Sequence, residues 1–159
     1  MSSSLAPSTA SLRQIRKIAV LGAGTMGSRI AAHIANAGAP VVLLDIVPPG
    51  TSADADKATK NKLVLAALDG LKKSKPAAFF ISENARLITI GNFDDDLAQI
   101  ADCDWIIEVV AEDLEIKRAL LTKVEQHRRP DSIVTSNTSG LPIHKIVEGM
   151  SDDLRHHWF

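Results

Sequence analysis

The sequence has little that would direct it to a membrane, to nucleic acid or to an oxidising compartment. Its single cysteine, Cys103, cannot form an internal disulfide and therefore favours a reducing compartment. No apolar run approaches the roughly 18 residues of a membrane span, so we expect none. Basic and acidic residues nearly balance at a net charge of −1, which argues against nucleic acid or an anionic membrane as the main partner.

The length of 159 residues allows one sizeable core and is short for two domains. Residues 1–14 are rich in serine and alanine, with one arginine and no acidic residue. We expect them to be a disordered leader, and an organellar transit peptide is the alternative. The folded domain is therefore expected to occupy residues 15–159.

An apolar segment, residues 17–21, leads directly into the glycine turn Gly22-Ala23-Gly24-Thr25-Met26-Gly27. In a G-x-G-x-x-G turn the first glycine permits the bend, the second lets backbone approach a pyrophosphate, and the third lets a helix pack closely on the strand. The amide groups and positive dipole end of that helix then face the phosphates. A second apolar segment ends at Asp45, close to the expected interval of about 20 residues. The pattern predicts a dinucleotide-binding site.

Apolar strands alternate with helical patterns along the rest of the chain. The strands are expected at residues 17–21, 41–44, 87–90, 105–110 and 133–136. The helices are expected from the glycine turn to Gly38, over 53–73, over 97–101, from 114 to about 128, and between Pro142 and Gly149, and residues 152–159 lead toward a sixth strand. Because the strands are continuously apolar, helices should cover both faces of a parallel sheet. The fold class is therefore α/β, a doubly wound parallel sheet of the Rossmann type.

Several segments allow more than one interpretation. The expected core face of the first helix consists of Met26, Ile30, Ile34 and Ala37. The lysines of the helix over 53–73 form either a solvated face or a landing surface for a phosphate-bearing substrate. Residues 94–96, three aspartates, are expected to cap the next helix and not to bind a metal. Phe79 and Phe80 are either core residues or contacts with another part of a protein.

Asp45 is the residue that discriminates between nucleotides. A carboxylate at the end of the second strand accepts hydrogen bonds from ribose hydroxyls and repels a 2′-phosphate. The following residues, Ile46 to Pro48, are not basic, so the sequence favours NAD over NADP. FAD would also use an acidic residue here, and an ordinary role for Asp45 in a turn after a strand remains open.

Two further segments, taken with the glycine turn, resemble the L-3-hydroxyacyl-CoA dehydrogenase family. They are Ile107-Glu108-Val109-Val110-Ala111-Glu112-Asp113-Leu114-Glu115-Ile116-Lys117 and Ser136-Asn137-Thr138-Ser139. The similarity extends from about Arg16 to the last residue. Residues 77–80 further resemble the large bacterial members, in which an enoyl-CoA hydratase domain follows much later in the chain.

The resemblance implies a role for each of several residues. Glu112 and Lys117 would contact the ribose and nicotinamide side of NAD, and Asn137 would shape the nicotinamide pocket. Ser139 would hydrogen-bond the 3-oxygen of the substrate. Ile46 and Ala111 would line the cofactor crevice. From the residues alone, Glu112 and Lys117 could equally be surface residues too far apart for a helical ion pair, and the serine-rich segment could be a turn and N-cap before Pro142.

The resemblance also implies a reaction, and it names a motif and a domain of the family that are not found in this sequence. The expected reaction is oxidation of (S)-3-hydroxyacyl-CoA to 3-oxoacyl-CoA in fatty-acid β-oxidation, with hydride transfer to NAD. The family's general-base histidine stands in a G-x-H-F-F-N-P motif, followed by a helical substrate domain that supplies dimer contacts, and neither is found in this sequence. His156 and His157 lack the context of that motif, and we do not expect them to bind a metal.

We therefore expect an NAD-binding domain that is inactive alone. The full-length protein is expected to be an oligomeric enzyme located in the cytoplasm, and the mitochondrial matrix is the alternative location. A standalone NAD-binding sensor, and a different β-hydroxyacid dehydrogenase, are the alternatives.

Overall fold

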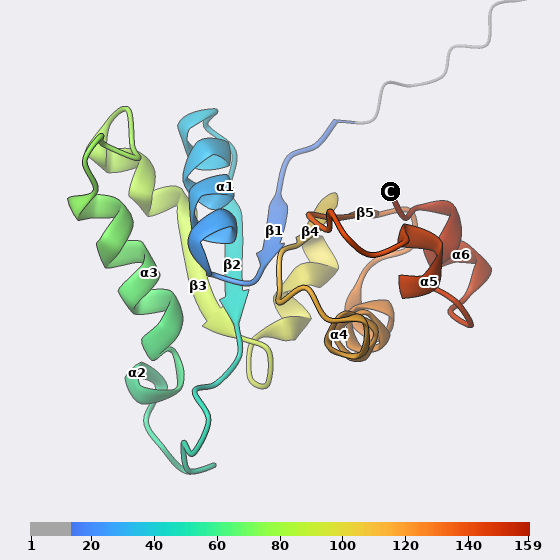
Figure 1. Cartoon of the computed structure of the whole chain (residues 1–159). Helices are drawn as coiled ribbons and strands as arrows, with labels where there is room; N and C mark the ends of the chain where they lie inside the picture. The colour runs from blue at the N-terminus through green and yellow to red at the C-terminus, as the bar shows by residue number, and fades with distance from the viewer. Residues whose placement is uncertain (1–13) are drawn as a thin grey trace, which may run out of the picture.

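Five parallel strands form the centre of the structure, a computed structural model in which residues 14–159 are described. The strands are β1 (Ile18–Leu21), β2 (Val41–Asp45), β3 (Ile88–Asn92), β4 (Trp105–Glu108) and β5 (Ile133–Ser136). Their order in the sheet is β3-β2-β1-β4-β5 (Figure 1). The chain moves outward from β1 to β3 and then crosses over to place β4 on the other side of β1, so the strand order reverses between β1 and β4. This order is that of a doubly wound dinucleotide-binding sheet, as predicted. The leader expected at residues 1–14 lies outside the described residues except for Gln14.

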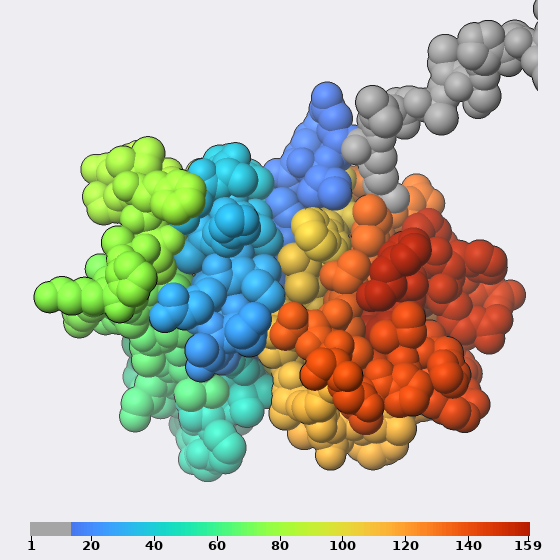
Figure 2. Space-filling view, turned by 45° about the horizontal axis from the view of Figure 1, so that its top comes forward, coloured from blue at the N-terminus to red at the C-terminus, as the bar shows by residue number. Residues whose placement is uncertain are grey.

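Helices cover both faces of the sheet. They are α1 (Thr25–Asn36), α2 (Lys57–Lys60), α3 (Lys62–Lys73), α4 (Leu114–His127), α5 (Ile143–Ile146) and α6 (Asp152–His156), with 3₁₀ helices η1 (Ser82–Leu87) and η2 (Leu97–Asp102). One buried cluster joins the sheet to α1 and α3, and the other joins it to η2, α4, α5 and α6. In the space-filling view, the blue-to-green N-terminal segments and the orange-to-red C-terminal segments occupy opposite sides of the molecule (Figure 2).

The alternating side chains of β1 explain why its sequence is apolar throughout. Ala19 and Leu21 belong to one buried cluster, whereas Ile18 and Val20 belong to the other. Each strand residue thus contacts a helix layer whichever way it points, which is the burial expected of a parallel sheet. None of the helices within residues 14–159 is long and apolar enough to cross a membrane.

The helix expected over residues 53–73 is two helices, and it begins later than predicted. Asp56 is the N-cap of α2, where its side chain accepts a hydrogen bond from the Thr59 amide at 2.9 Å. Asn61 separates α2 from α3 at φ −94° and ψ 14°, although the backbone hydrogen bonds from Asn61 to Lys57 and from Leu65 to Asn61 continue. Its buried side chain accepts a hydrogen bond from Asn92 at 2.7 Å, a tertiary contact that helical periodicity does not encode.

The prediction that the aspartates at 94–96 cap the following helix is wrong. Asp96 is the N-cap of η2, but its side chain makes no capping hydrogen bond and instead accepts from the Asn92 amide at 3.0 Å. Lys57 lies 3.3 Å from Asp96, and Lys60 lies 3.2 Å from Asp95. These aspartates therefore compensate part of the lysine-rich surface of α2.

The core face predicted for α1 is right for Ile30 and Ile34, which pack half-buried against the cluster, and wrong for Met26 and Ala37, which are exposed. Met26 is 53% exposed, and the buried residues facing the sheet are Gly27, Ala31, Ala32 and Ala35, with Ser28. Small side chains allow the helix axis to lie close to the strands, so the larger residues of α1 are displaced to its flanks. Of the phenylalanine pair, Phe79 is buried and Phe80 is exposed.

The end of β4 and the C-terminal segment differ from the sequence-based expectation. β4 ends at Glu108 and not at residue 110, because the Val110 amide donates to the Glu108 carboxylate at 2.7 Å and leaves the ladder. Residues 152–156 form α6, which was not predicted, with Ser151 as its side-chain cap. The expected approach to a sixth strand is confirmed, since Trp158 then forms a parallel bridge with Val134 next to β5.

We predict that Gly27→Ala destabilises the fold. A Cβ atom at Gly27 would lie 1.9 Å from the Gly22 carbonyl oxygen, so strand and helix would have to separate. The free energy of unfolding from urea denaturation should fall by about 1–3 kcal/mol. The matched control is Gly70→Ala in α3, where a Cβ meets nothing within 4 Å and alanine favours the helix. Equal stabilities of the two variants would contradict the prediction.

Candidate functional site

The bend after β1 requires glycine at two of its three glycine positions. Gly22 has a φ of 112°, and its amide donates to the Leu44 carbonyl at 2.7 Å. A Cβ at Gly22 would lie 2.6 Å from the Val109 carbonyl oxygen, and Gly27 is in the close contact described above. A Cβ at Gly24, by contrast, would meet nothing within 4 Å, so the space next to this residue is open. The first and third glycines thus shape the bend, and the second leaves room for a ligand.

The N-terminus of α1 opens onto that space. Gly24 is its N-cap, without a side-chain capping hydrogen bond, and the first turn holds no acidic residue. Gly24, Thr25 and Met26 are exposed, whereas Gly22, Ala23 and Gly27 are buried. Uncapped amides at the positive end of a 12-residue helix are suited to bind an anionic group.

Asp45 lies directly beside the bend. One carboxylate oxygen accepts a hydrogen bond from the Ala23 amide at 2.7 Å, and the other accepts from the Ile46 amide at 2.7 Å. The half-buried carboxylate therefore joins the end of β2 to the glycine turn. The structure brings these predicted residues together.

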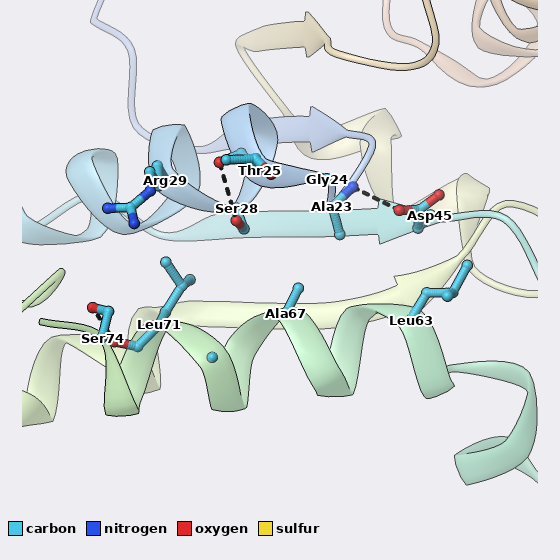
Figure 3. A pocket seen from close by; sticks show the side chains of 11 residues that line it. Ala23, Gly24, Thr25, Ser28, Arg29, Asp45, Leu63, Ala67, Leu71 and Ser74 are labelled. Atoms are coloured by element: carbon cyan, nitrogen blue, oxygen red, sulfur yellow. Dashed lines mark hydrogen bonds between the residues drawn. The ribbon is translucent and has the colours of Figure 1, made fainter.

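Two hollows meet at Gly24 and Asp45. One, of about 540 Å³, has mostly apolar walls contributed by residues after β1, β2, β3 and β4 and by α4. Its lining is Gly22, Gly24, Asp45, Ile46, Phe93, Val109, Val110, Ala111, Ile116, Ala119, Leu120 and Lys123. The other, of about 470 Å³, lies between α1 and α3, where Leu71 faces the side of Ser28 and Arg29 and Leu63 faces Asp45 (Figure 3). The predicted residues Ile46 and Ala111 line the first hollow, but the α4 residues were not predicted.

Lys117 is buried, so the interpretation of Lys117 as a surface residue is wrong. Its side chain is 1% exposed, and its ammonium lies 2.8 and 3.0 Å from the two carboxylate oxygens of Glu108, which is fully buried. It also lies 3.4 Å from Glu112, so the two residues form an ion pair although their spacing does not allow one within a helix. Glu112 precedes α4, where the chain is not yet helical and its side chain can turn back. Sequence reasoning gave Glu108 no role.

Glu112 holds the loop that follows β5. One of its oxygens accepts hydrogen bonds from the Thr138 hydroxyl at 2.6 Å, the Ser139 amide at 3.0 Å and the Gly140 amide at 2.8 Å. The hydrogen bond from Thr138 and those from the backbone, with the nearby charge of Lys117, lower the pKa of Glu112 to about 2. The carboxylate therefore remains ionised at physiological pH, close to Ser139.

The loop after β5 also agrees in part with its interpretation as a turn. The Thr138 hydroxyl accepts from the Leu141 amide at 3.3 Å, whereas Pro142 is the N-cap of α5 without a side-chain capping bond. Asn137 and Ser139 are exposed at the carboxyl end of β5. The expected N-cap is thus absent from α5, and a turn is present.

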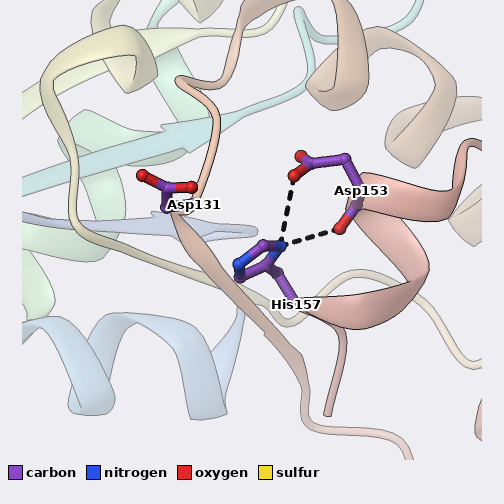
Figure 4. Close-up of side chains that lie close together, drawn as sticks. All are labelled: Asp131, Asp153 and His157. Atoms are coloured by element: carbon purple, nitrogen blue, oxygen red, sulfur yellow. Dashed lines mark hydrogen bonds and ion pairs between the residues drawn. The ribbon is translucent and has the colours of Figure 1, made fainter. Parts of the chain in front are cut away.

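A separate group of possible metal ligands lies elsewhere in the described residues. Asp131, Asp153 and His157 have ligand atoms within 4.8 Å of one another (Figure 4). Asp153 is already paired with the guanidinium of Arg128, whose side chain is 3% exposed, and with His157 at 3.4 Å. Asp131 precedes β5, which places the group at the amino edge of the sheet, opposite the glycine bend. We interpret it as an ion-pair cluster that joins α6 to the end of α4.

Comparison with known proteins identifies a family of NAD-binding domains. The profile of the 3-hydroxyacyl-CoA dehydrogenase NAD-binding domain matches residues 17–159. A Bacillus subtilis protein named as a 3-hydroxyacyl-CoA dehydrogenase is 45% identical over 154 residues, which cover 92% of this chain and 20% of that protein. A Rickettsia felis protein named as a fatty acid oxidation complex trifunctional enzyme is 43% identical, over 89% of this chain and 19% of that protein. The chain therefore spans about a fifth of the length of these two relatives.

A solved structure shows the same fold. The 3-hydroxybutyryl-CoA dehydrogenase of Escherichia coli superposes with a TM-score of 0.69 at 26% sequence identity, covering 89% of this chain and 28% of that one.

We predict that Glu112→Gln reduces stability at neutral pH and that this reduction shrinks in acid. The pKa of Glu112 is lower in the folded chain than its ordinary value of 4.5. Its ionised form therefore stabilises the fold above about pH 4.5, and this contribution is lost as the pH falls toward 2. Urea denaturation from pH 7 downward should show the two proteins converging. A difference that does not depend on pH would contradict this assignment.

Proposed function

The chain belongs to the family of NAD-binding domains of 3-hydroxyacyl-CoA dehydrogenases, and we propose that the whole protein oxidises (S)-3-hydroxyacyl-CoA to 3-oxoacyl-CoA. The observation that carries this proposal is the grouping of an open glycine bend, Asp45 and the Glu112–Lys117 pair at one edge of the sheet. Open α/β sheets bind ligands at this carboxyl edge, at the point where the strand order reverses.

The cofactor would lie across this reversal point. The amides at the start of α1 would bind the diphosphate, and Asp45 would accept hydrogen bonds from the adenosine ribose. The apolar hollow next to Asp45 and Ile46 has room for the adenine ring. The other half of NAD would then extend over the ends of β4 and β5, toward Glu112 and Ser139.

The residues at the ends of β4 and β5 would serve the reaction. When bound, NAD accepts a hydride from the carbon that carries the substrate hydroxyl. The Ser139 hydroxyl would donate a hydrogen bond to the substrate 3-oxygen and hold it near the nicotinamide. Lys117 and Glu112 would contact the nicotinamide ribose, and Asn137 would line the pocket. The hydroxyl proton requires a general base, for which the family resemblance implies a histidine–glutamate pair.

The remaining partners are part of the same proposal. We propose acyl-CoA as the substrate and the lysines of α3 as candidates to bind its phosphates. We also propose that the full-length protein is a homo-oligomer. We propose a cytoplasmic location, in line with a sequence whose single cysteine cannot form an internal disulfide. Cys103 is buried, and burial raises the pKa of its thiol to about 11.

Nucleotide selectivity tests the role of Asp45. We expect the wild-type chain to bind NAD more tightly than NADP in calorimetric titrations. Asp45→Asn keeps an oxygen for the Ala23 amide but removes the charge that repels a 2′-phosphate. The preference for NAD should therefore narrow by about tenfold or more.

Gly24→Ala is the matched control for this titration. Its Cβ would occupy the open space next to the diphosphate and leave the Asp45 carboxylate in place. Gly24→Ala should weaken the binding of NAD and the binding of NADP by the same factor. Wild-type protein that binds NADP as well as NAD would refute the assignment of Asp45.

Activity distinguishes a dehydrogenase from an NAD-binding sensor. We expect the full-length protein to form NADH from (S)-3-hydroxybutyryl-CoA and NAD, and the 159-residue chain to bind NAD without this turnover. NADH absorbance follows the reaction in both. NAD binding without turnover by the full-length protein would favour a sensor, and turnover by the 159-residue chain would contradict the expectation that it is inactive alone.

A further inference from the structure

We infer that Glu108 is a positioning residue that shapes the half of the site facing the nicotinamide, by holding Lys117 and the loop after β5 in place. The proposed function gives Glu108 no contact with cofactor or substrate. Its side chain is nevertheless fully buried at the end of β4, next to residues that do receive such contacts. This inference rests on the proposed function, because it concerns the same site.

All four acceptor positions of the Glu108 carboxylate are used. One oxygen accepts from the Val110 amide at 2.7 Å and from the Lys117 ammonium at 2.8 Å. The other accepts from Lys117 at 3.0 Å and from the Ser136 hydroxyl. A carboxylate surrounded by three donor groups in this way is held in a single orientation.

The Glu108 side chain thereby connects β4, α4 and the loop after β5. Glu108 pairs with Ser136 in the strand register, and its backbone carbonyl accepts from the Asn137 amide at 2.9 Å. The Ser136 hydroxyl in turn accepts from the Thr138 amide at 3.1 Å. The backbone on either side of Asn137 is therefore fixed by Glu108, directly or through Ser136.

The charges of the three side chains depend on one another. Lys117 has two carboxylates within 3.4 Å, the buried Glu108 and the 43%-exposed Glu112. Without the Glu108 charge, the buried ammonium would retain the Val110 carbonyl at 3.5 Å and the exposed Glu112 as its one charged partner, and would have to move toward Glu112 or toward solvent. Either movement changes the position of the Glu112 oxygen that holds the Ser139 and Gly140 amides.

Most hydrogen bonds of this group lie on the side of β4 and β5. Asp45 bonds the Ala23 and Ile46 amides and not Glu108, and the apolar hollow meets the Glu108 group at Val110, whose amide donates to the Glu108 carboxylate. Ser136 ends β5 and residues 137–140 follow it, on the other side of β1 in the sheet from β2. A change at Glu108 should therefore affect ligands that extend past the diphosphate more than ligands that stop there.

The test compares NAD with ADP, which carries only the adenosine and diphosphate part. Calorimetry of the 159-residue chain should show that Glu108→Gln weakens NAD on the order of tenfold, while the Kd for ADP changes by less than about twofold. The emission of bound NADH, which reports on the nicotinamide surroundings, should also differ from that of wild type. Glu115→Gln is the matched control, an exposed glutamate on α4, and should bind both ligands as wild type does.

A second variant keeps the test decisive if Glu108→Gln does not fold. Ser136→Ala leaves the Glu108–Lys117 pair and removes the link to Thr138, so it should show the same selective loss of NAD affinity. NAD binding at wild-type strength in either folded variant, or equal losses for NAD and ADP, would overturn the inference alone. A wild-type chain that binds neither ligand would overturn the proposed function and this inference with it.

Discussion

The contact between two pieces of backbone, Gly22 at the end of β1 and Gly27 in α1, is the constraint on which the site depends. Neither position has space for a side chain, since a Cβ would lie 2.6 Å from the Val109 carbonyl at Gly22 and 1.9 Å from the Gly22 carbonyl at Gly27. The contact fixes the distance from helix to strand and therefore where the first amides of α1 point. Asp45 can reach the Ala23 amide only because the bend is held at this place. The diphosphate site is thus a consequence of close backbone packing and not of any charged side chain.

The two sides of this bend use charge differently. On the side of β2, a single carboxylate accepts from two backbone amides and remains half-exposed, so it is accessible to a ligand. On the side of β4 and β5, the Glu108–Lys117 pair lies in the interior, where an unpaired ion would be strongly unfavourable. Buried pairs contribute little net stability in general, but they hold their neighbours in one geometry. We attribute to this pair the ordering of a loop that the sequence would otherwise leave flexible, with its serines and its glycine.

Much of the fold was predictable because it depends on local patterns. Continuous apolar segments predicted all five strands and the helix layers on both faces, and the glycine turn predicted the bend and its relation to Asp45. The errors occurred where a tertiary contact overrides a local preference. The break between α2 and α3 falls at Asn61, whose side chain bonds Asn92, and the aspartates after β3 pair with Lys57 and Lys60 in place of capping η2. The small residues of α1 are buried since close packing on the sheet outweighs side-chain hydrophobicity.

The site illustrates the same limit more sharply. The spacing of Glu112 and Lys117 was judged as if both stood on one helix, whereas Glu112 precedes α4 and turns back toward Lys117. The principal partner of Lys117 lies nine residues before it, at the end of β4, and no helical periodicity relates a strand residue to a helix residue. One signal was present in the sequence: an acidic residue at the end of an otherwise apolar strand needs a buried donor. Applied to Glu108, that rule predicts a basic partner on the next helix, and Lys117 is the first basic residue of α4.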